Sequence, residues 1–337
     1  MRFGVGLPTC TAGMMYPAPF ASAQDVVGIA IEAEQLGFFE VAGNDHLSTQ
    51  EYVRREWSVP PDFFDPLMIL SHCAAHTSTL RLMTGILVVP MRHPVVLAKQ
   101  VATLDQLSRG RVILGVGIGA YREEFTACYP ERAGVARSEL LNEGVALMRR
   151  LWTERTVTFA GRHVTVSDVE MFPKPVQDPL PVFFAGNALG SIRRAAEQGQ
   201  GWMPAGIGPD AVASGRHRLD ALALAAQRRP ADIVTAPQVV VSLGATHADA
   251  VATFESSQLF KHLVSLKDST LRDADMSRLT EGNLVGTPDE VCSRIAEYAR
   301  AGATHLSGLL FVGNSVEELV RGMRWFSHDV IPGFAEV

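Results

Sequence analysis

The sequence has few cysteines and no long apolar runs. Its four cysteines, Cys10, Cys73, Cys128 and Cys292, lie far apart and form no C-x-x-C pair. Neither a disulfide framework nor a zinc ribbon is therefore indicated, and free thiols are expected. The longest apolar runs, such as residues 85–90, are far too short to cross a bilayer, so we expect no membrane span.

An excess of basic residues is also missing. The net charge is −6 and no basic stripe offsets it, which makes nucleic acid an improbable partner and favours a small molecule. The amino terminus, residues 1–8, alternates apolar and small residues and then breaks at Pro8. This pattern is typical of a first strand rather than of a signal peptide, and it predicts a cytoplasmic protein.

Strand-like and helix-like segments alternate along the whole chain. Apolar strand patterns begin near residues 3, 38, 80, 112, 182, 201, 234 and 304. Helical periodicity covers residues 25–36, 66–75, 94–107, 136–152, 188–198, 210–227, 288–301 and 316–326. No shift in composition marks a domain boundary. The sequence therefore predicts an α/β fold with a single domain over residues 1–337, a (β/α)₈ TIM barrel.

Two segments interrupt this rhythm. Residues 156–159 and 163–166 flank the turn Ala160-Gly161-Arg162 and predict an antiparallel hairpin. Residues 248–283 lack a clean period, and we expect a helical insertion segment at the C-terminal face of the barrel, over its mouth.

The chemistry of such a barrel sits at the carboxyl ends of its strands. The second strand ends in Asp45-His46, and His46 is the one histidine placed to act as an acid, a base or a hydrogen-bond donor. The alternative is that Asp45 caps the next segment and His46 packs. The third strand ends in Thr84-Gly85-Ile86, where a glycine within a bulky run indicates a bulge or the close approach of a ligand.

Glycine-rich turns follow the fourth and fifth strands. Residues 115–120 nominally match the G-x-G-x-x-A dinucleotide fingerprint, but strand–helix units precede them, and residues 121–125 resemble a loop or short turn. The fifth strand ends in Ala185-Gly186-Asn187-Ala188 and enters a helix with Arg193 and Arg194. This end is either an anion site, most naturally for phosphate, or an ordinary turn beside solvated arginines.

Metal binding is poorly supported. His72 and His76 are spaced to share a helix face, but no carboxylate lies nearby and neither histidine falls at a strand end. A metal-dependent barrel hydrolase would need His and Asp clustered at several strand ends, and only Asp45-His46 is found. No metal is expected.

Together these motifs resemble the bacterial luciferase-like monooxygenase superfamily. The resemblance spans nearly the whole chain, and it rests on Asp45-His46, residues 80–90, His93-Pro94, residues 97–100, the segment LDQLSRGR at 104–111, Phe172-Pro173-Lys174-Pro175, Ala185-Gly186-Asn187, Gly201-Trp202 and residues 286–291.

The resemblance implies a barrel that holds FMN or the deazaflavin coenzyme F420, with His46 beside the ring as the catalytic residue. It implies a non-proline cis peptide, Gly85–Ile86, beneath the ring, and a phosphate-holding turn. The cofactor-binding residues expected are Asp45, Thr84, Gly85, Ile86, Gly117, Gly119, Gly186, Asn187 and Ala188. A homodimer is also implied.

Two departures from the family favour F420 over FMN. Bacterial luciferase has a cysteine and an arginine where this chain has Gly117 and Ile118, and its arginine reaches the FMN phosphate. F420-dependent sugar-phosphate dehydrogenases have a glutamate where this chain has Ala120. We therefore expect F420-dependent hydride transfer to another substrate. The alternatives are an FMNH₂- and O₂-dependent monooxygenase and a non-catalytic barrel that only binds a cofactor.

The loops expected to form the substrate pocket are 9–21, 47–62 and 248–283. They and the residues beside them are rich in apolar and aromatic side chains, namely Met14, Met15, Tyr16, Phe20, Tyr52, Trp57, Phe63 and Phe64. These side chains either contact a largely apolar substrate or pack on one another as a lid.

Overall fold

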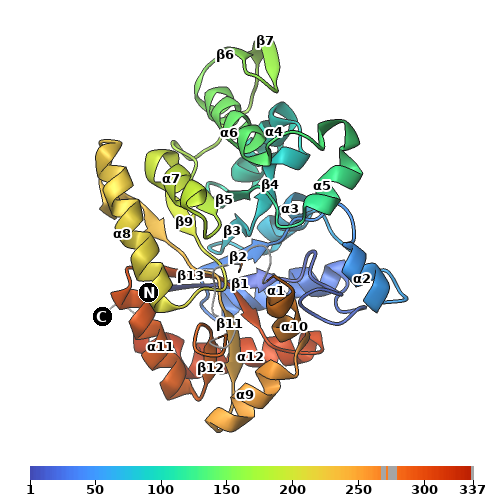
Figure 1. The fold of residues 1–337 in the computed structure, drawn as a ribbon, viewed down its shortest axis with the longest axis vertical. Coiled ribbons are helices and arrows are strands. Elements are labelled where there is room, and N and C mark those ends of the chain that lie inside the picture. Colours follow the sequence, from blue (N-terminus) through green and yellow to red (C-terminus); the bar gives the residue numbers. More distant parts are fainter. Residues whose placement is uncertain (267–270, 272–278, 335–337) are drawn as a thin grey trace.

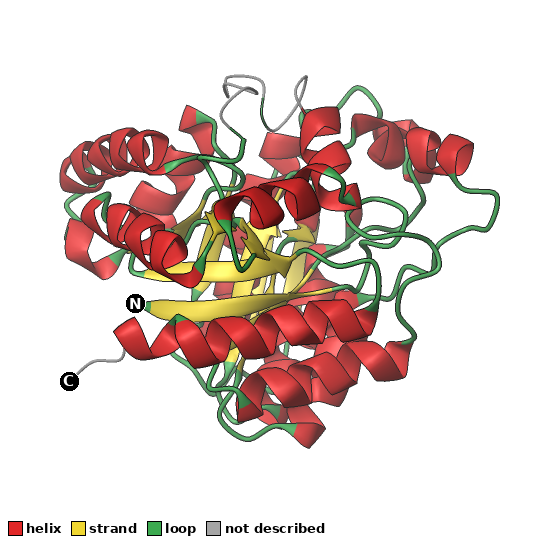
Figure 2. Cartoon of the chain, turned by 90° about the horizontal axis from the view of Figure 1, so that it is seen from below, coloured by secondary structure: helices red, strands yellow, loops and turns green. Residues whose placement is uncertain are grey.

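The structure is a computed structural model that describes residues 1–266, 271 and 279–334 (Figure 1). Parallel strands form a barrel surrounded by helices, as Figure 2 also shows. In chain order the barrel strands are β1 (Arg2–Leu7), β2 (Glu40–Gly43), β3 (Arg81–Thr84), β5 (Val112–Gly117), β8 (Val182–Ala185), β9 (Gly201–Met203), β10 (Val234–Thr235), β11 (Val240–Leu243) and β13 (His305–Phe311).

The barrel is closed by the segment that contains β10 and β11. On one edge Ala236 N–H donates to Trp202 O at 2.9 Å. On the other edge Thr304 N–H donates to Thr235 O, and Leu310 N–H donates to Val239 O, each at 3.1 Å. Because β10 and β11 are two parts of one strand, the circle has the eight members that the sequence predicts, and the predicted (β/α)₈ fold is confirmed.

Helices follow the strands on the outside of the barrel. They are α1 (Ala23–Gln35), α2 (Glu51–Glu56), α3 (Pro66–His76), α4 (Pro94–Leu107), α5 (Arg122–Cys128), α6 (Arg137–Thr153), α7 (Leu189–Gln198), α8 (Pro209–Ala225), α9 (His247–Glu255), α10 (Gln258–Ser265), α11 (Pro288–Arg300) and α12 (Val316–Asp329). Their starts follow from local sequence. Ser22 and Asp25 form a capping box on α1, and Thr287 and Glu290 form another on α11.

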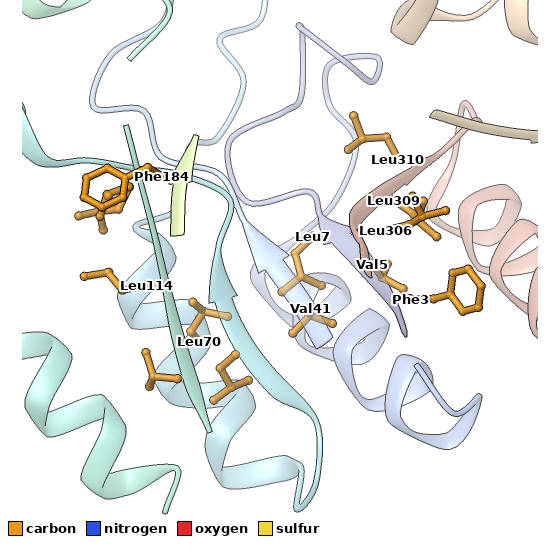
Figure 3. Packing of buried hydrophobic residues seen from close by; sticks show 14 of the residues in the cluster. Phe3, Val5, Leu7, Val41, Leu70, Leu114, Phe184, Leu306, Leu309 and Leu310 are labelled. Carbon is orange, nitrogen blue, oxygen red and sulfur yellow. The ribbon is translucent and has the colours of Figure 1, made fainter. Parts of the chain in front are cut away.

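The core lies on both sides of the strands. Six buried side chains from successive strand segments form one cluster inside the barrel. They are Ala42, Met83, Ile113, Phe183, Met203 and Ala236. The larger cluster fills the layer between strands and helices, where Val5, Leu114 and Phe184 are fully or almost fully buried (Figure 3). Strands covered on both faces explain the near-continuous apolar runs of the sequence.

The third strand contains the expected bulge. Leu82 pairs with Val112 of β5, but Leu87 in β4 (Leu87–Val88) pairs with Val116, so the segment between them holds one residue more than β5 opposite it. The Gly85–Ile86 peptide within this bulge is cis, as the family resemblance implies.

The segment LDQLSRGR has a structural role. Asp105 is fully buried and its carboxylate accepts backbone N–H groups of Val176 and Gln177 at 2.8 and 2.9 Å. Arg111 donates to the carbonyl oxygens of Ala74, Thr77 and Leu80 at 2.8–3.0 Å. These charged groups tie loops at the amino-terminal ends of the strands together, far from the expected chemistry.

The two irregular segments were predicted only in part. The hairpin β6 (Thr156–Ala160) and β7 (Thr165–Glu170) is present and projects from one end of the molecule (Figure 1). The insertion begins with helices α9 and α10 as expected, and part of the predicted range, residues 267–270 and 272–278, lies outside the described residues. The strand β12 (Leu284–Gly286), which pairs with β11, was not predicted.

Candidate active site

A cavity of about 1060 Å³ opens at the carboxyl ends of the barrel strands. This volume lies at the upper end of the range for sites that enclose organic ligands, so a tricyclic ring and a second molecule fit. All predicted site residues except one line it: Asp45, His46, Gly85, Ile86, Gly117, Gly119, Gly186, Asn187 and Ala188. Thr84 does not line the cavity, and its hydroxyl donates to Gly115 O at 2.7 Å between two strands.

His46 is held from behind by Glu124. Its Nδ1 lies 2.8 Å from Glu124 Oε2, and the other carboxylate oxygen accepts N–H groups of Leu47 at 2.6 Å and Ser48 at 3.2 Å. Burial tends to raise the pKa of Glu124, but the hydrogen bond from His46 and these backbone donors outweigh it, so the pKa is lowered. The carboxylate is therefore ionised over the neutral pH range.

An ionised Glu124 fixes the tautomer of His46. Nδ1 must carry a hydrogen to donate to the carboxylate, which leaves Nε2 as the acceptor of the neutral ring. The amide nitrogen of Gln50 lies 2.9 Å from the same Nδ1 but also 3.3 Å from Glu124 Oε2, to which it can donate. His46 can then take a proton at Nε2 from a ligand in the cavity and return it.

Glu124 was missed because the sequence interpretation of residues 121–125 as a loop or short turn is wrong. The helix α5 begins at Arg122 and carries Glu124 inward, with 4% of its surface exposed. One sequence signal could have found it: Glu124 lies about one helical turn after the glycine-rich end of β5. At that position its carboxylate can reach a histidine that follows another strand, His46.

Asp45 belongs to a second charged group below His46. Its Oδ2 accepts the backbone N–H of Val88 at 2.8 Å and pairs with Arg92 at 2.6 Å, and Arg92 also pairs with Asp65 at 2.8 Å. Burial raises the pKa of Asp45, and the Arg92 guanidinium counteracts it. Asp45 Oδ1 and the neighbouring Asn44 Oδ1 are buried and have no hydrogen-bond partner among the described residues, and both residues line the cavity.

Glycines make one wall of the cavity flat. A Cβ atom on Gly117 would lie 2.8 Å from Cδ1 of Ile86, so only glycine lets that side chain lie over β5. Gly119 has φ 79° and Gly186 has φ 117°, which are values that favour glycine. The Rossmann alternative is excluded, because these glycines lie within a closed barrel and not in a doubly wound sheet.

The turn after β8 is braced by its own asparagine. Asn187 exchanges hydrogen bonds of 3.0 Å with the backbone N–H and carbonyl of Ala205. Arg194 donates to Asn142 at 2.6 Å and does not line the cavity, whereas Arg122 and Arg137 lie on the cavity wall near β5. Arg137 donates to Gly119 O at 2.8 Å and Arg122 to Ala133 O at 2.9 Å, and these partners are backbone carbonyls rather than carboxylates.

Most of the aromatic residues expected near the substrate pack on one another. Tyr16 stacks on Phe20 with ring centroids 4.2 Å apart, and Trp57 Nε1 donates to Gly13 O at 3.0 Å. Of the side chains named from the loops, only Met15 lines the cavity.

A second histidine, His262 of α10, lies on the cavity wall and was not predicted. It comes from the insertion, whose irregular pattern gave no sign of it. Of the two histidines that line the cavity in the described part of the chain, one was therefore named from the sequence.

The described residues contain no group of three or more His, Cys, Asp and Glu side chains arranged to hold a metal ion. His76 Nδ1 lies 3.0 Å from the carbonyl oxygen of His72 in its own helix. Within the described part of the chain no helix has the length and apolarity that a membrane crossing requires.

Curated relatives match over most of the chain. An F420-dependent glucose-6-phosphate dehydrogenase of Amycolatopsis mediterranei is 29% identical over 334 residues, which cover 92% of this chain and 94% of the relative. The enzyme of the same name from Beutenbergia cavernae is 30% identical over 303 residues, covering 84% and 86%.

Solved structures share the fold. The monooxygenase RslO1 of Streptomyces bottropensis superposes with a TM-score of 0.79 at 28% identity, over 99% of this chain and all of that one. An F420-dependent secondary alcohol dehydrogenase in complex with an F420-acetone adduct gives 0.80 at 21% identity, over 99% of both chains. The family model described as luciferase-like monooxygenase matches residues 1–305. The chain belongs to the luciferase-like monooxygenase family.

Proposed function

We propose that the protein is an F420-dependent oxidoreductase that transfers a hydride between the cofactor and an uncharged, largely apolar substrate. The observation that carries the proposal is the fixed tautomer of His46, whose Nε2 is left as a proton acceptor beside a cavity wide enough for the cofactor and a substrate together.

The residues present fit a deazaflavin. The unpartnered oxygens of Asn44 and Asp45 are acceptors for ring N–H groups, and the glycines at 85 and 117 leave a flat wall for the ring. The turn 186–188, with Arg122 and Arg137 at the same side of the cavity, suits the phosphate and the acidic tail. When bound, F420 supplies a carbon that accepts or donates a hydride.

The chain's own part of the reaction is orientation and proton handling. Glu124 keeps Nδ1 of His46 protonated, so Nε2 takes the hydroxyl proton when a substrate is oxidised and returns it when a carbonyl is reduced. The apolar side chains of Ile86, Tyr121 and Met15 on the cavity wall exclude water from this transfer.

The recess beside the cavity supports an uncharged substrate. It has a volume of about 40 Å³ and shares Met15, His262, Leu266 and Leu271 with the main cavity. No lysine, arginine or acidic side chain is among the described residues that line it. A phosphate dianion would lose its hydration in this recess without a partner, so we infer that the recess holds an apolar part of the substrate.

A second candidate is an FMNH₂-dependent monooxygenase, which the likeness to RslO1 favours. The two candidates are separated by titrating the purified protein with F420 and with FMN, and by mixing it with each reduced cofactor anaerobically and in air. We expect tight binding of F420 and turnover without oxygen uptake. Preferential FMN binding with oxygen uptake would replace the proposal by the monooxygenase.

A His46→Gln variant tests the assignment of the proton acceptor. Its turnover should fall by roughly 100-fold or more, since general acid–base groups contribute ~10²–10⁴-fold, while F420 still binds. His217→Gln, an exposed histidine of α8 away from the cavity, is the matched control. Unchanged turnover in His46→Gln would show that His46 is not the proton acceptor, whereas a wild type that binds F420 without turnover favours a non-catalytic barrel.

The homodimer and the cytoplasmic location stay predictions. Light scattering of the purified protein across a dilution series measures the first, and cell fractionation measures the second.

A further inference from the structure

Three side chains from separate loops meet above His46. The Tyr52 hydroxyl of α2 lies 3.4 Å from the Tyr121 hydroxyl and 3.3 Å from Nδ1 of His262. The Tyr121 ring is 5.8 Å from the His46 ring, measured between centroids. Tyr121 and His262 line the cavity, and Tyr52 lies behind them.

Burial sets the protonation state of each group in the hydrogen-bonded chain Tyr121–Tyr52–His262. Burial raises the pKa of both tyrosines, so each keeps its hydroxyl hydrogen. Burial, with a smaller contribution from His46, lowers the pKa of His262 to about 4, so the ring is neutral at physiological pH. The distances allow this hydrogen-bond chain to run in either of two directions; the one in which Tyr121 donates to Tyr52 and Tyr52 donates to Nδ1 places the hydrogen of His262 on Nε2.

That N–H group is without a partner in the described structure. No hydrogen bond of His262 Nε2 is found there, although the residue is only 5% exposed and lines the cavity. Because His262 lines the cavity, a ligand that supplies an oxygen atom can accept from this N–H group. The described lining of the recess at His262 is largely apolar, with Leu263, Leu266 and Leu271, and its polar side chains, Gln238 and Asn283, are uncharged.

We propose that His262 is a substrate-binding residue whose Nε2–H donates to the oxygen of an uncharged secondary alcohol or ketone, opposite His46. The proposal rests on the proposed function and names its substrate class. In alcohol oxidation the O–H proton goes to His46 Nε2, and the carbinol C–H bond breaks with its electron pair passing to the oxidised cofactor. The carbon–oxygen double bond forms, and the cofactor is reduced by two electrons.

The two histidines would have separate tasks in this reaction. The developing negative charge on oxygen is stabilised by the fixed donor of His262, while His46 alone exchanges the proton. His262 cannot act as a competing acid because it stays neutral. Tyr52 is a positioning residue, since it touches His262 and not the cavity.

The kinetic test uses cyclohexanol with F420 and cyclohexanone with reduced F420. We expect kcat/KM to fall about 10²–10³-fold in His262→Phe, as for the loss of one oxyanion donor, and by less in Tyr52→Phe. His262→Gln, which can still donate an N–H, should recover part of the activity. Lys261→Gln, an exposed neighbour on α10, is the control, and F420 binding should be unchanged in all four variants.

A second readout does not need turnover. In ¹⁵N-histidine NMR spectra, the signal that disappears in His262→Phe should show a neutral ring with hydrogen on Nε2 between pH 6 and 9. It should shift when cyclohexanone is added to the F420-loaded protein, and glucose 6-phosphate should cause no such shift.

The outcomes separate this inference from the proposed function. Turnover of the ketone by wild type with an equal rate in His262→Phe, or an unperturbed His262 signal, overturns the inference alone. A wild type that neither binds nor oxidises reduced F420 overturns both. A shift and turnover with glucose 6-phosphate instead of the ketone overturns the substrate class.

Discussion

Replacing Glu40 by glutamine is expected to stabilise the protein increasingly as the pH rises. Glu40 begins β2 and is 1% exposed, and within the described residues no group makes a hydrogen bond of good geometry to its carboxylate oxygens, although the Ser307 hydroxyl lies close to them. Its side chain fills the space left by Gly4, where a Cβ atom would lie 2.2 Å from Cγ of Glu40. The carboxyl group is thus enclosed inside the barrel, at the end opposite the cavity.

Burial raises the pKa of Glu40 from 4.5 to about 7, and the nearby Ser307, Arg81 and Arg2 counteract only part of the effect. Because the folded-state pKa is the higher one, the protonated form is favoured by folding. Its stabilising contribution is complete below pH 4.5 and is lost as the pH rises through about 7. At ~1.36 kcal/mol per pH unit the loss is about 3 kcal/mol.

Guanidinium chloride unfolding of wild type and Glu40→Gln at pH 5 and pH 8 measures this difference. Glutamine keeps the shape but cannot ionise, so the free energy of unfolding of the variant relative to wild type should rise by roughly 2–3 kcal/mol between the two pH values. Glu255→Gln, at an exposed position of α9, is the control and should show no such change. A Glu40→Gln difference that is the same at both pH values would refute the reasoning.

Three further variants test the site and the barrel. Glu124→Gln lets an amide donate to His46 Nδ1 and moves the hydrogen to Nε2, so kcat should fall by ~10²-fold or more while KM and F420 binding change little; equal falls in binding and turnover would indicate misfolding instead. Arg111→Lys loses the fork that reaches several carbonyl oxygens and should lower the free energy of unfolding by about 1–3 kcal/mol in denaturant melts. Gly215→Ala places a Cβ atom 2.1 Å from the Trp202 ring and should lower the melting temperature, and an unchanged melting temperature would show that α8 can shift outward.

The strand and helix order could be predicted because buried parallel strands and amphipathic helices leave different periods in the sequence. The bulge could be predicted too, since Gly85 interrupts a run that is otherwise bulky. The division of residues 80–89 into β3 and β4 at that point depends on pairing with β5, which local sequence does not carry. The pairing of β12 with β11 is non-local in the same way.

The residues that support His46 could not be found from local sequence. Glu124 reaches His46 from a helix 78 positions later, and Asp45 meets Arg92 across 47 positions. Both contacts exist because the barrel brings the carboxyl ends of its strands to one place. Polar residues that follow different strands are candidates for such contacts, but sequence alone does not say which pair forms.

The loops around the cavity show why apolar content alone is a poor guide to a substrate pocket. Tyr16, Phe20 and Trp57 satisfy one another or the backbone and leave the cavity to other side chains. His262 reaches the cavity because α10 presents an otherwise apolar face there, and the same apolar contacts that bury it keep it uncharged. His46, in contrast, contacts an ionised carboxylate. The two histidines of this cavity thus lie in opposite electrostatic surroundings. Because of this difference, one histidine can transfer the proton while the other binds the substrate oxygen, although both are the same residue type.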